Sequence, residues 1–306
     1  MAQREIRHIP VLLQEVLRII DPRPGQVVVD CTLGLGGHAV ELLRRVTPGG
    51  SLIGIDFDPR NIELARPMLT GVGGQFSIHH GNFAGLHQIL AEGGMVGVDG
   101  ILADLGVASP QIDDRMRGFS YRLDGPLDMR MDPTRGQPAS ALLARMSEAE
   151  LRDAIVELGD ETDAPEIARL IVERRRQRPI RTTHQLMAII CEARHFTLQR
   201  AAGAKLHPAA RTFQALRILT NREMGNLENL LRVLPGCLKP GGVAAIISFH
   251  SGEDRRVKES FKEGLRTGAY CDISDDPIKA GEGEAMDNPR SRSAKLRWAR
   301  RASEAS

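Results

Sequence analysis

The chain has 306 residues, of which 42% are hydrophobic, and its 41 basic side chains almost balance 39 acidic ones. This length can bury one large core or two modest ones, and a net charge of +2 does not by itself indicate a nucleic-acid partner. The apolar stretches are shorter than the roughly 20 residues that span a bilayer, and the first residues lack a signal-peptide profile. We therefore expect a cytoplasmic protein that does not bind a membrane. The four cysteines form no CxxC pair, which argues against a disulfide framework and against a metal site.

Helical and strand patterns alternate in the first third of the chain. An amphipathic helix is predicted over residues 11–20, and short β-prone runs follow at 27–30, 51–56, 75–80 and 100–104. Helical stretches or turns separate these runs. This βαβα pattern predicts a parallel sheet that is covered by helices on both faces.

The middle of the chain has a different pattern. Residues 115–212 contain no convincing strand, whereas helix signals recur. Two capping boxes, Ser147 with Glu150 and Thr182 with Gln185, each precede an apolar run. We therefore expect a helical insert.

Sheet-like patterns return in the last third of the chain. One long amphipathic helix is predicted over residues 213–234, and a strand follows at 243–249. The segments 268–274 and 294–300 are predicted to add edge strands, and 279–289 is predicted to be a loop.

The chain is therefore expected to form one interrupted α/β domain. Residues 1–113 and 213–306 would build the sheet domain, and residues 114–212 would form an inserted all-helical domain. The insert is a candidate for substrate recognition.

A glycine-rich turn follows the first predicted strand. Gly34, Gly36 and Ala39 satisfy the G-x-G-x-x-G/A pattern, so the turn could bind a nicotinamide dinucleotide, bind S-adenosyl-L-methionine (AdoMet), or only connect a strand to a helix. Asp30 closes the first strand and suits the amino group of AdoMet better than a pyrophosphate. Asp56 closes the second strand and can accept hydrogen bonds from two ribose hydroxyls, a role that both cofactors share.

Three further segments are expected at the same edge of the sheet, because ligands of open α/β sheets lie beyond the carboxyl ends of the strands. Phe83 follows the third strand and could stack on an adenine, although an ordinary core position is an equal alternative. Residues 103–111 follow the fourth strand, and residues 248–256 follow the fifth.

Several longer motifs resemble the bacterial MraW/RsmH family of small-subunit ribosomal RNA methyltransferases. They occur in the family's order over nearly the whole chain and include DCTLGLGGH (30–38), DGILADLGVASPQID (99–113), RGFSYRLDGPLDMRMDPTRG (117–136), HPAARTFQALRI (207–218) and SFHSGEDR (248–255). The resemblance implies a class I AdoMet-dependent methyltransferase (Rossmann-like) fold with a helical insert. It also implies N4-methylation of a specific cytidine in the decoding centre, at the P site, of 16S rRNA in the small ribosomal subunit.

The resemblance also implies a set of cofactor-binding residues. Carried over motif by motif, they are Gly36, Gly37, His38, Asp56, Phe83, Asp104 and Gln111. The residue patterns alone add Asp30 and Gly34, whereas His38 is assigned only through the resemblance, since a lone histidine at a helix start is more often a capping or surface residue.

Asp104 is the candidate catalytic residue. The lone pair of a cytosine N4 is delocalised into the ring, so the enzyme has to localise it on the nitrogen. Many amino-methyltransferases do this with an Asp/Asn-Pro-Pro-aromatic motif after the fourth strand, where this chain has Asp104-Leu105-Gly106. We hypothesise that Asp104 accepts a hydrogen bond from the target N4 or from the AdoMet amino group, and that positioning supplies most of the rate.

Basic segments provide candidates for RNA contact. Residues 169–181 are rich in arginine, with a solvated helix face as the alternative, and residues 288–301 carry basic side chains and no acid. The predicted substrate contacts are His250, Arg255, Arg217, Arg292, Lys295 and Trp298. The carboxylates of Asp124, Asp128 and Asp132 are expected in a structured loop, with Arg130 paired to one of them.

Two other functions stay open from the residues alone. They are an NAD-dependent oxidoreductase, which would bind a pyrophosphate at the glycine turn, and a non-catalytic RNA-binding factor for ribosome assembly. The oligomeric state is not fixed by the sequence, so a homodimer remains open.

Overall fold

The computed structural model describes residues 10–204 and 206–303 and divides into two compact units. Unit 1 combines Met1–Gly106 with Gly225–Ser306, and unit 2 is Val107–Met224. Each unit has its own hydrophobic core, and each is described by itself below.

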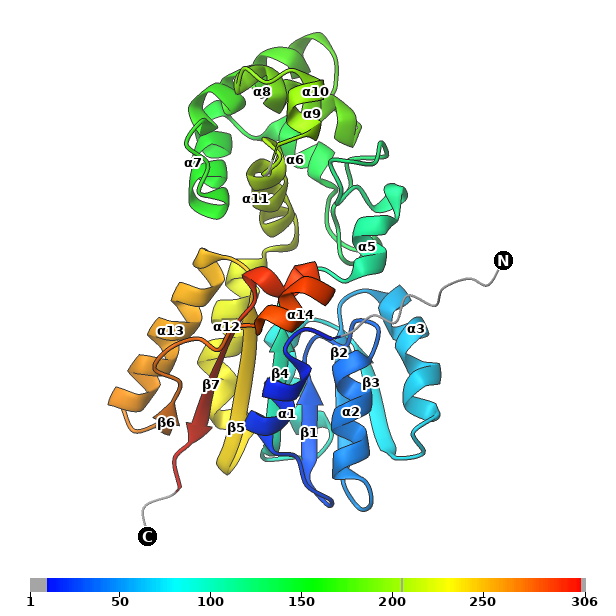
Figure 1. Ribbon diagram of the computed structural model, residues 1–306, viewed down its shortest axis with the longest axis vertical. Coiled ribbons are helices and arrows are strands. Elements are labelled where there is room, and N and C mark those ends of the chain that lie inside the picture. Colours follow the sequence, from blue (N-terminus) through cyan, green and yellow to red (C-terminus); the bar gives the residue numbers. More distant parts are fainter. Residues whose placement is uncertain (1–9, 205, 304–306) are drawn as a thin grey trace. The chain divides into compact units, whose positions relative to one another are not determined.

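Unit 1 contains a seven-stranded sheet with the order β3-β2-β1-β4-β5-β7-β6 (Figure 1). Strands β1 to β5 are parallel to one another, and β7 is antiparallel to both β5 and β6. The strands are β1 (Val27–Asp30), β2 (Ser51–Asp56), β3 (Gln75–His80), β4 (Val98–Asp104), β5 (Leu238–Ser248), β6 (Tyr270–Ile273) and β7 (Lys295–Arg301). This is the expected class I methyltransferase topology, with the strand order reversing between β1 and β4.

Alternate residues of each strand point to opposite faces of the sheet, so two apolar layers form. Val28 and Leu102 join the layer under α1 (Leu13–Ile20), α2 (Gly37–Val46) and α3 (Pro59–Thr70). Val29 and Ile101 join the opposite layer, which is covered by α4 (Leu86–Glu92), α12 (Glu223–Cys237) and α13 (Ser251–Arg266). Burial on both faces explains why these strands are almost continuously apolar.

Unit 2 is helical, as predicted. Its elements are α5 (Ser109–Asp113), a 3₁₀ turn at Arg115–Arg117, α6 (Ala139–Arg145), α7 (Glu148–Gly159), α8 (Ala164–Gln177), α9 (Thr183–Ala193), α10 (Leu198–Ala202) and α11 (Ala210–Asn221). Both predicted capping boxes are present, at Ser147 with Glu150 and at Thr182 with Gln185. Arg130 pairs with Asp128 at 2.7 Å, which confirms the expected pairing in the loop before α6.

Three predicted elements were wrong. The long helix over 213–234 is two helices, α11 and α12, because Arg222 adopts a left-handed conformation with φ of 52°. The side chain of Asn221 bonds the backbone at Met129 and Met131 of the neighbouring loop, which fixes this break. The predicted loop 279–289 contains α14 (Glu282–Asp287), which is followed by a 3₁₀ turn at Pro289–Ser293. The strand over 294–300 is not at the sheet edge, because β7 lies between β5 and β6.

The unit boundaries also differ from the predicted domain boundaries of 113/114 and 212/213. Residues 107–113 and 213–224 group with the helical unit rather than with the sheet. The reason is packing, since Phe213 and Leu216 are buried in the same apolar cluster as Leu151 and Ile155 of α7. Helix α11 is therefore part of the helical core.

Other sequence expectations concern cysteines, metals and membranes. Cys31, Cys191 and Cys237 are buried as free thiols and Cys271 is an exposed one. Within residues 10–204 and 206–303, no group of three metal-ligating side chains comes together. No helix in that part of the chain is long and apolar enough to cross a membrane.

Gly125 sets a steric limit in unit 2 that can be tested. A β-carbon at this position would lie 1.9 Å from the carbonyl oxygen of Arg115, and the Gly125 backbone bonds Thr183 at the start of α9. We expect Gly125→Ala to lower the free energy of unfolding in urea by at least about 2 kcal/mol, because backbone has to move. Gly203→Ala is the matched control, since nothing lies within 4 Å of its added β-carbon. Equal stability of the two variants would contradict this account.

Candidate cofactor site at the carboxyl edge of the sheet

Three aspartates end neighbouring parallel strands of unit 1. Asp30 ends β1, Asp56 ends β2 and Asp104 ends β4. In the sheet register Asp30 lies opposite Gly54 on one side and Leu102 on the other, so the three carboxylates meet at one edge. This edge includes the switch point between β1 and β4, where ligands of such sheets bind.

The glycine turn crosses this edge between β1 and α2. Gly34 and Gly36 have φ of 51° and 81°, a left-handed conformation that favours glycine. The amide of Gly34 donates a 2.7 Å hydrogen bond to Oδ2 of Asp56, which ties the turn to the end of β2. Gly37 begins α2, and a β-carbon there would lie 2.5 Å from Cγ of Pro10. The chain around the turn is therefore closely packed.

The Asp56 carboxylate is a hydrogen-bonding hub. Besides Gly34 it accepts the amide of Asp58 at 2.8 Å and the side-chain amide of Asn61 at 3.2 Å. Burial raises the pKa of Asp56 to about 6, although these hydrogen bonds partly offset the effect. In this structure Asp56 therefore holds the glycine turn, and ribose binding by Asp56 stays a prediction.

Thr32 links the ends of β1 and β4. Its amide donates to Oδ1 of Asp30 at 3.1 Å, and its hydroxyl oxygen accepts the amide of Asp104 at 2.6 Å. Burial raises the pKa of Asp30 to about 6, and the nearby Asp104 and Asp56 carboxylates raise it further, while His38 and Thr32 lower it. Asp30 is thus a buried acid that a neighbouring cation would stabilise in its charged form.

His38 lies beside these acids in the first turn of α2. It is 6% exposed, and neither ring nitrogen has a hydrogen-bond partner among the described residues. Its Nε2 lies 3.6 Å from Oδ2 of Asp104, while Oδ1 of Asp104 is also buried without a partner. Buried polar atoms are nearly always hydrogen-bonded, so this group is suited to a polar ligand.

Phe83 and Gln111 occupy different surroundings. Phe83 begins a 3₁₀ turn after β3 and packs, partly buried, against the apolar layer that contains Leu86. Gln111 belongs to unit 2, where its Oε1 accepts the amide of Ala108 at 2.9 Å and caps α5. These surroundings neither support nor contradict the predicted contacts of Phe83 and Gln111 with the cofactor.

The predicted RNA contacts near α13 and in α11 divide into paired and exposed side chains. Arg255 is exposed on α13, whereas Nε2 of His250 lies 3.3 Å from Oε1 of Glu253. Arg217 forms a bidentate pair with Glu223 at 2.8 and 2.9 Å. Arg217 therefore stabilises the end of α11, and contact with RNA would require it to leave this pair.

The predicted contacts around β7 are also partly engaged. Lys295 donates to Asp254 at 3.0 Å, and Arg297 donates to the same carboxylate at 2.7 Å. Burial would raise the pKa of Asp254, but these two hydrogen bonds lower it overall. Arg292 is exposed and donates to a backbone oxygen of α14, and Trp298 is partly buried in the interior strand β7.

Two polar residues of the site were missed from the sequence. Thr32 and Asn61 organise the aspartates, but each acts through a partner on another element. Their only local signal is their position in the turns after β1 and β2, where polar residues are common anyway.

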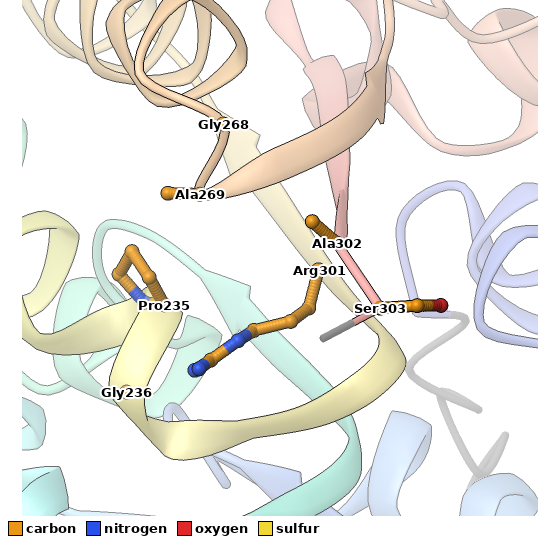
Figure 2. Close-up of a pocket in the computed structure, with 7 residues that line it drawn as sticks. All are labelled: Pro235, Gly236, Gly268, Ala269, Arg301, Ala302 and Ser303. Atoms are coloured by element: carbon orange, nitrogen blue, oxygen red, sulfur yellow. The ribbon is translucent and has the colours of Figure 1, made fainter. Parts of the chain in front are cut away.

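A separate cavity of about 310 Å³ lies in unit 1 beside the first residues of β5, at the opposite edge of the sheet. Figure 2 shows the side chain of Arg301 crossing it toward Gly236. Its lining residues, Pro235, Gly236, Gly268, Ala269, Arg301, Ala302 and Ser303, include none of the candidate site residues.

Comparison with known proteins gives both structural and sequence relatives. Among solved structures, a SAM-dependent O-methyltransferase from Thermotoga maritima aligns with 99% of this chain and 70% of its own, at a TM-score of 0.44 and 10% identity. Aeropyrum pernix fibrillarin in complex with S-adenosyl-L-methionine aligns with 90% of this chain and 67% of its own, at a TM-score of 0.39 and 11% identity.

The sequence relatives are much closer. A protein of Geobacter sp. (strain M21) is 47% identical over 310 residues, covering 96% of this chain and 98% of its own. One of Acidobacterium capsulatum is 43% identical over 300 residues, with the same coverage. Both are named ribosomal RNA small subunit methyltransferase H. The sequence model of the MraW methylase family matches residues 5–302, and the chain therefore belongs to that family.

Proposed function

We propose that this chain is a cytoplasmic enzyme that uses AdoMet to methylate N4 of a specific cytidine at the P site, in the decoding centre of small-subunit (16S) rRNA. The observation that carries this proposal is the group of buried polar atoms at His38 and Asp104 that lack hydrogen-bond partners among the described residues, in a chain of the MraW methylase family. The names of the relatives support an rRNA substrate in the small subunit. The N4 position and the cytidine come from the resemblance of the sequence motifs.

The charges of the site suit AdoMet. Its ammonium and sulfonium groups are cationic, and Asp30 is an acid whose pKa is raised mainly by burial, so a bound cation would stabilise its charged form. The pyrophosphate of a dinucleotide is negatively charged, so the carboxylates of the site would repel it and weaken its binding. The site therefore favours AdoMet over the alternative of a nicotinamide cofactor.

Each residue can be given a part in binding. Asp30 or Asp104 would accept the ammonium group, and the ring nitrogens of His38 would bond polar atoms of the methionine part. Gly34, Gly36 and Gly37 would let the ligand approach the backbone of the turn. Asp56 and Phe83 would contact the ribose and the adenine, and Gln111 is assigned to the cofactor by the motif resemblance alone. When bound, AdoMet supplies the methyl group.

The chemical step requires little from the protein beyond positioning. Asp104 would accept a hydrogen bond from the cytosine amine, which localises the lone pair on N4. As the N4–methyl bond forms and the sulfur–methyl bond breaks, the nitrogen becomes acidic. Its proton can then leave to water or to a nearby carboxylate, so no strong base is needed. The presence of Asp30, Asp56 and Asp104 together also favours an enzyme over a non-catalytic assembly factor.

Replacing Asp104 tests the catalytic assignment. We expect Asp104→Asn to lower kcat on small subunits that lack the modification by on the order of 10²-fold or more, because the amide accepts a weaker hydrogen bond. Asp99→Asn is the matched control, since Asp99 lies in the same strand but pairs with Lys239. Transfer is measured with labelled AdoMet, and mass spectrometry of the nucleosides identifies the product. Wild-type turnover by Asp104→Asn would remove Asp104 from the mechanism, and a product other than N4-methylcytidine would overturn the proposed reaction.

The affinity for AdoMet is expected to depend on pH through Asp30. A cation binds the charged carboxylate, and the pKa of Asp30 in the free protein is raised to about 6. Binding must therefore displace a proton at lower pH, so the dissociation constant should rise about tenfold per pH unit below that value and be flat above it. Calorimetry from about pH 5 to about pH 8 checks this slope.

The Asp30→Asn variant is the control for that titration. It should bind AdoMet more weakly at neutral pH and should lose the part of the slope that Asp30 contributes. A wild-type dissociation constant that stays level below pH 6 would show that the Asp30 carboxylate does not face the cofactor's cation.

A further inference from the structure

Two aromatic rings stack on each other in unit 2. The rings of Tyr121 and His207 have centroids 4.3 Å apart and planes 18° apart. The rings of Tyr121 and Phe213 also form a T-shaped contact, with centroids 5.7 Å apart and planes 84° apart. Phe213 is buried in the helical core, whereas Tyr121 and His207 are both partly exposed. The pair is thus anchored on one side and reaches the surface on the other.

The His207 ring is held in one tautomer. Its Nδ1 accepts the amide of Ala209 at 3.1 Å, so the ring proton of the neutral form lies on Nε2. Burial lowers the pKa of His207, and the nearby charge of Arg122 lowers it further. The ring is therefore neutral at physiological pH and presents a flat aromatic surface without a charge. No bond from Nε2 is formed to the described residues.

Arg122 brings a cation to the same place. Its Cζ lies 5.9 Å from the centroid of the Tyr121 ring, and the side chain is exposed. Within the described part of the chain Arg122 forms no ion pair. This differs from the arginine-rich helix α8, where Arg169 pairs with Glu166 and Glu173. Arg122 thus keeps its charge available to an external anion.

We propose that the Tyr121–His207 ring pair and Arg122 form a platform for one unpaired nucleotide of the RNA substrate. The base stacks on the exposed aromatic surface, and the guanidinium of Arg122 contacts a phosphate. Aromatic rings combined with arginine are the usual means of holding single-stranded RNA bases, because every base has a flat face. This inference rests on the proposed function and adds the residues that position the RNA.

Two replacements of His207 separate stacking from a structural role. Asparagine keeps an oxygen close to the position of Nδ1, so His207→Asn can still accept the amide of Ala209 but has no ring. Phenylalanine does the opposite, because His207→Phe keeps a ring and loses the acceptor. Base stacking is worth about 1–3 kcal/mol, so His207→Asn should raise KM for the RNA substrate about 5- to 150-fold with little change in kcat. His207→Phe should stay within about threefold of the wild type, because a ring is still present.

Photocrosslinking tests the contact itself. A fragment of the decoding-centre RNA carrying 5-iodocytidine is irradiated with the full-length protein, and the crosslinked peptides are mapped by mass spectrometry. We expect an adduct at Tyr121 in the wild-type protein. The adduct should be absent from the double variant that combines Arg122→Gln and His207→Asn. The other tyrosine of the chain, Tyr270, is 2% exposed in unit 1 and serves as the internal control that should give no adduct.

The outcomes distinguish this inference from the function on which it rests. Wild-type protein that transfers no methyl group to RNA overturns the proposed function and the platform together. Wild-type activity combined with an unchanged KM in His207→Asn overturns the platform alone. An equal rise of KM in His207→Asn and His207→Phe also overturns it, because the ring that His207→Phe retains would then not preserve RNA binding. A rise in His207→Phe alone overturns it too, because the loss would then follow the Ala209 hydrogen bond rather than the ring. Melting temperatures of all variants verify that they are folded.

Discussion

The crowding of acidic groups at one edge of the sheet is the constraint on which the rest of unit 1 depends. Asp30, Asp56 and Asp104 end adjacent parallel strands, and the register of the sheet leaves them no means of moving apart. Burying carboxylates is costly unless donors or cations compensate. The chain uses its own donors where it can, through Gly34, Thr32 and Asn61. Three further buried polar atoms, on His38 and Asp104, have no hydrogen-bond partner within residues 10–204 and 206–303.

The groups at this edge of the sheet are held in place by the protein's own hydrogen bonds. Asp56 fixes the glycine turn, and Thr32 joins the end of β1 to the backbone of β4, so the groups that would face a ligand are held by the protein before binding. A preorganised polar site does not have to reorganise when charge changes during a reaction. Two basic side chains of β7, Lys295 and Arg297, are by contrast already paired within the chain, with the carboxylate of Asp254.

The sequence predicted most of the fold because its signals are local. The continuous apolar runs of β1, β2 and β4, the capping boxes and the position of acids at strand ends are all readable within a few residues. The failures concern partners that are distant in the chain. The break at Arg222 depends on Asn221 bonding a loop about 90 residues earlier, and the pairing of Arg217 with Glu223 requires that break. Helix α14 carries Glu284, whose carboxylate accepts the amide of Leu12 near the start of the described chain. No local pattern encodes such contacts.

The placement of the helical unit between β4 and β5 affects how the sheet can form. Asp104 is the partner of Ile247 in the parallel ladder, yet the whole of unit 2 is synthesised between them. The helices of unit 2 have their own apolar core, so they can pack together before β5 joins the sheet. Among the parallel strand pairs, β4 and β5 are separated by the longest stretch of chain, so one side of β4 stays unpaired until β5 has been synthesised. Non-local pairing of this kind slows folding.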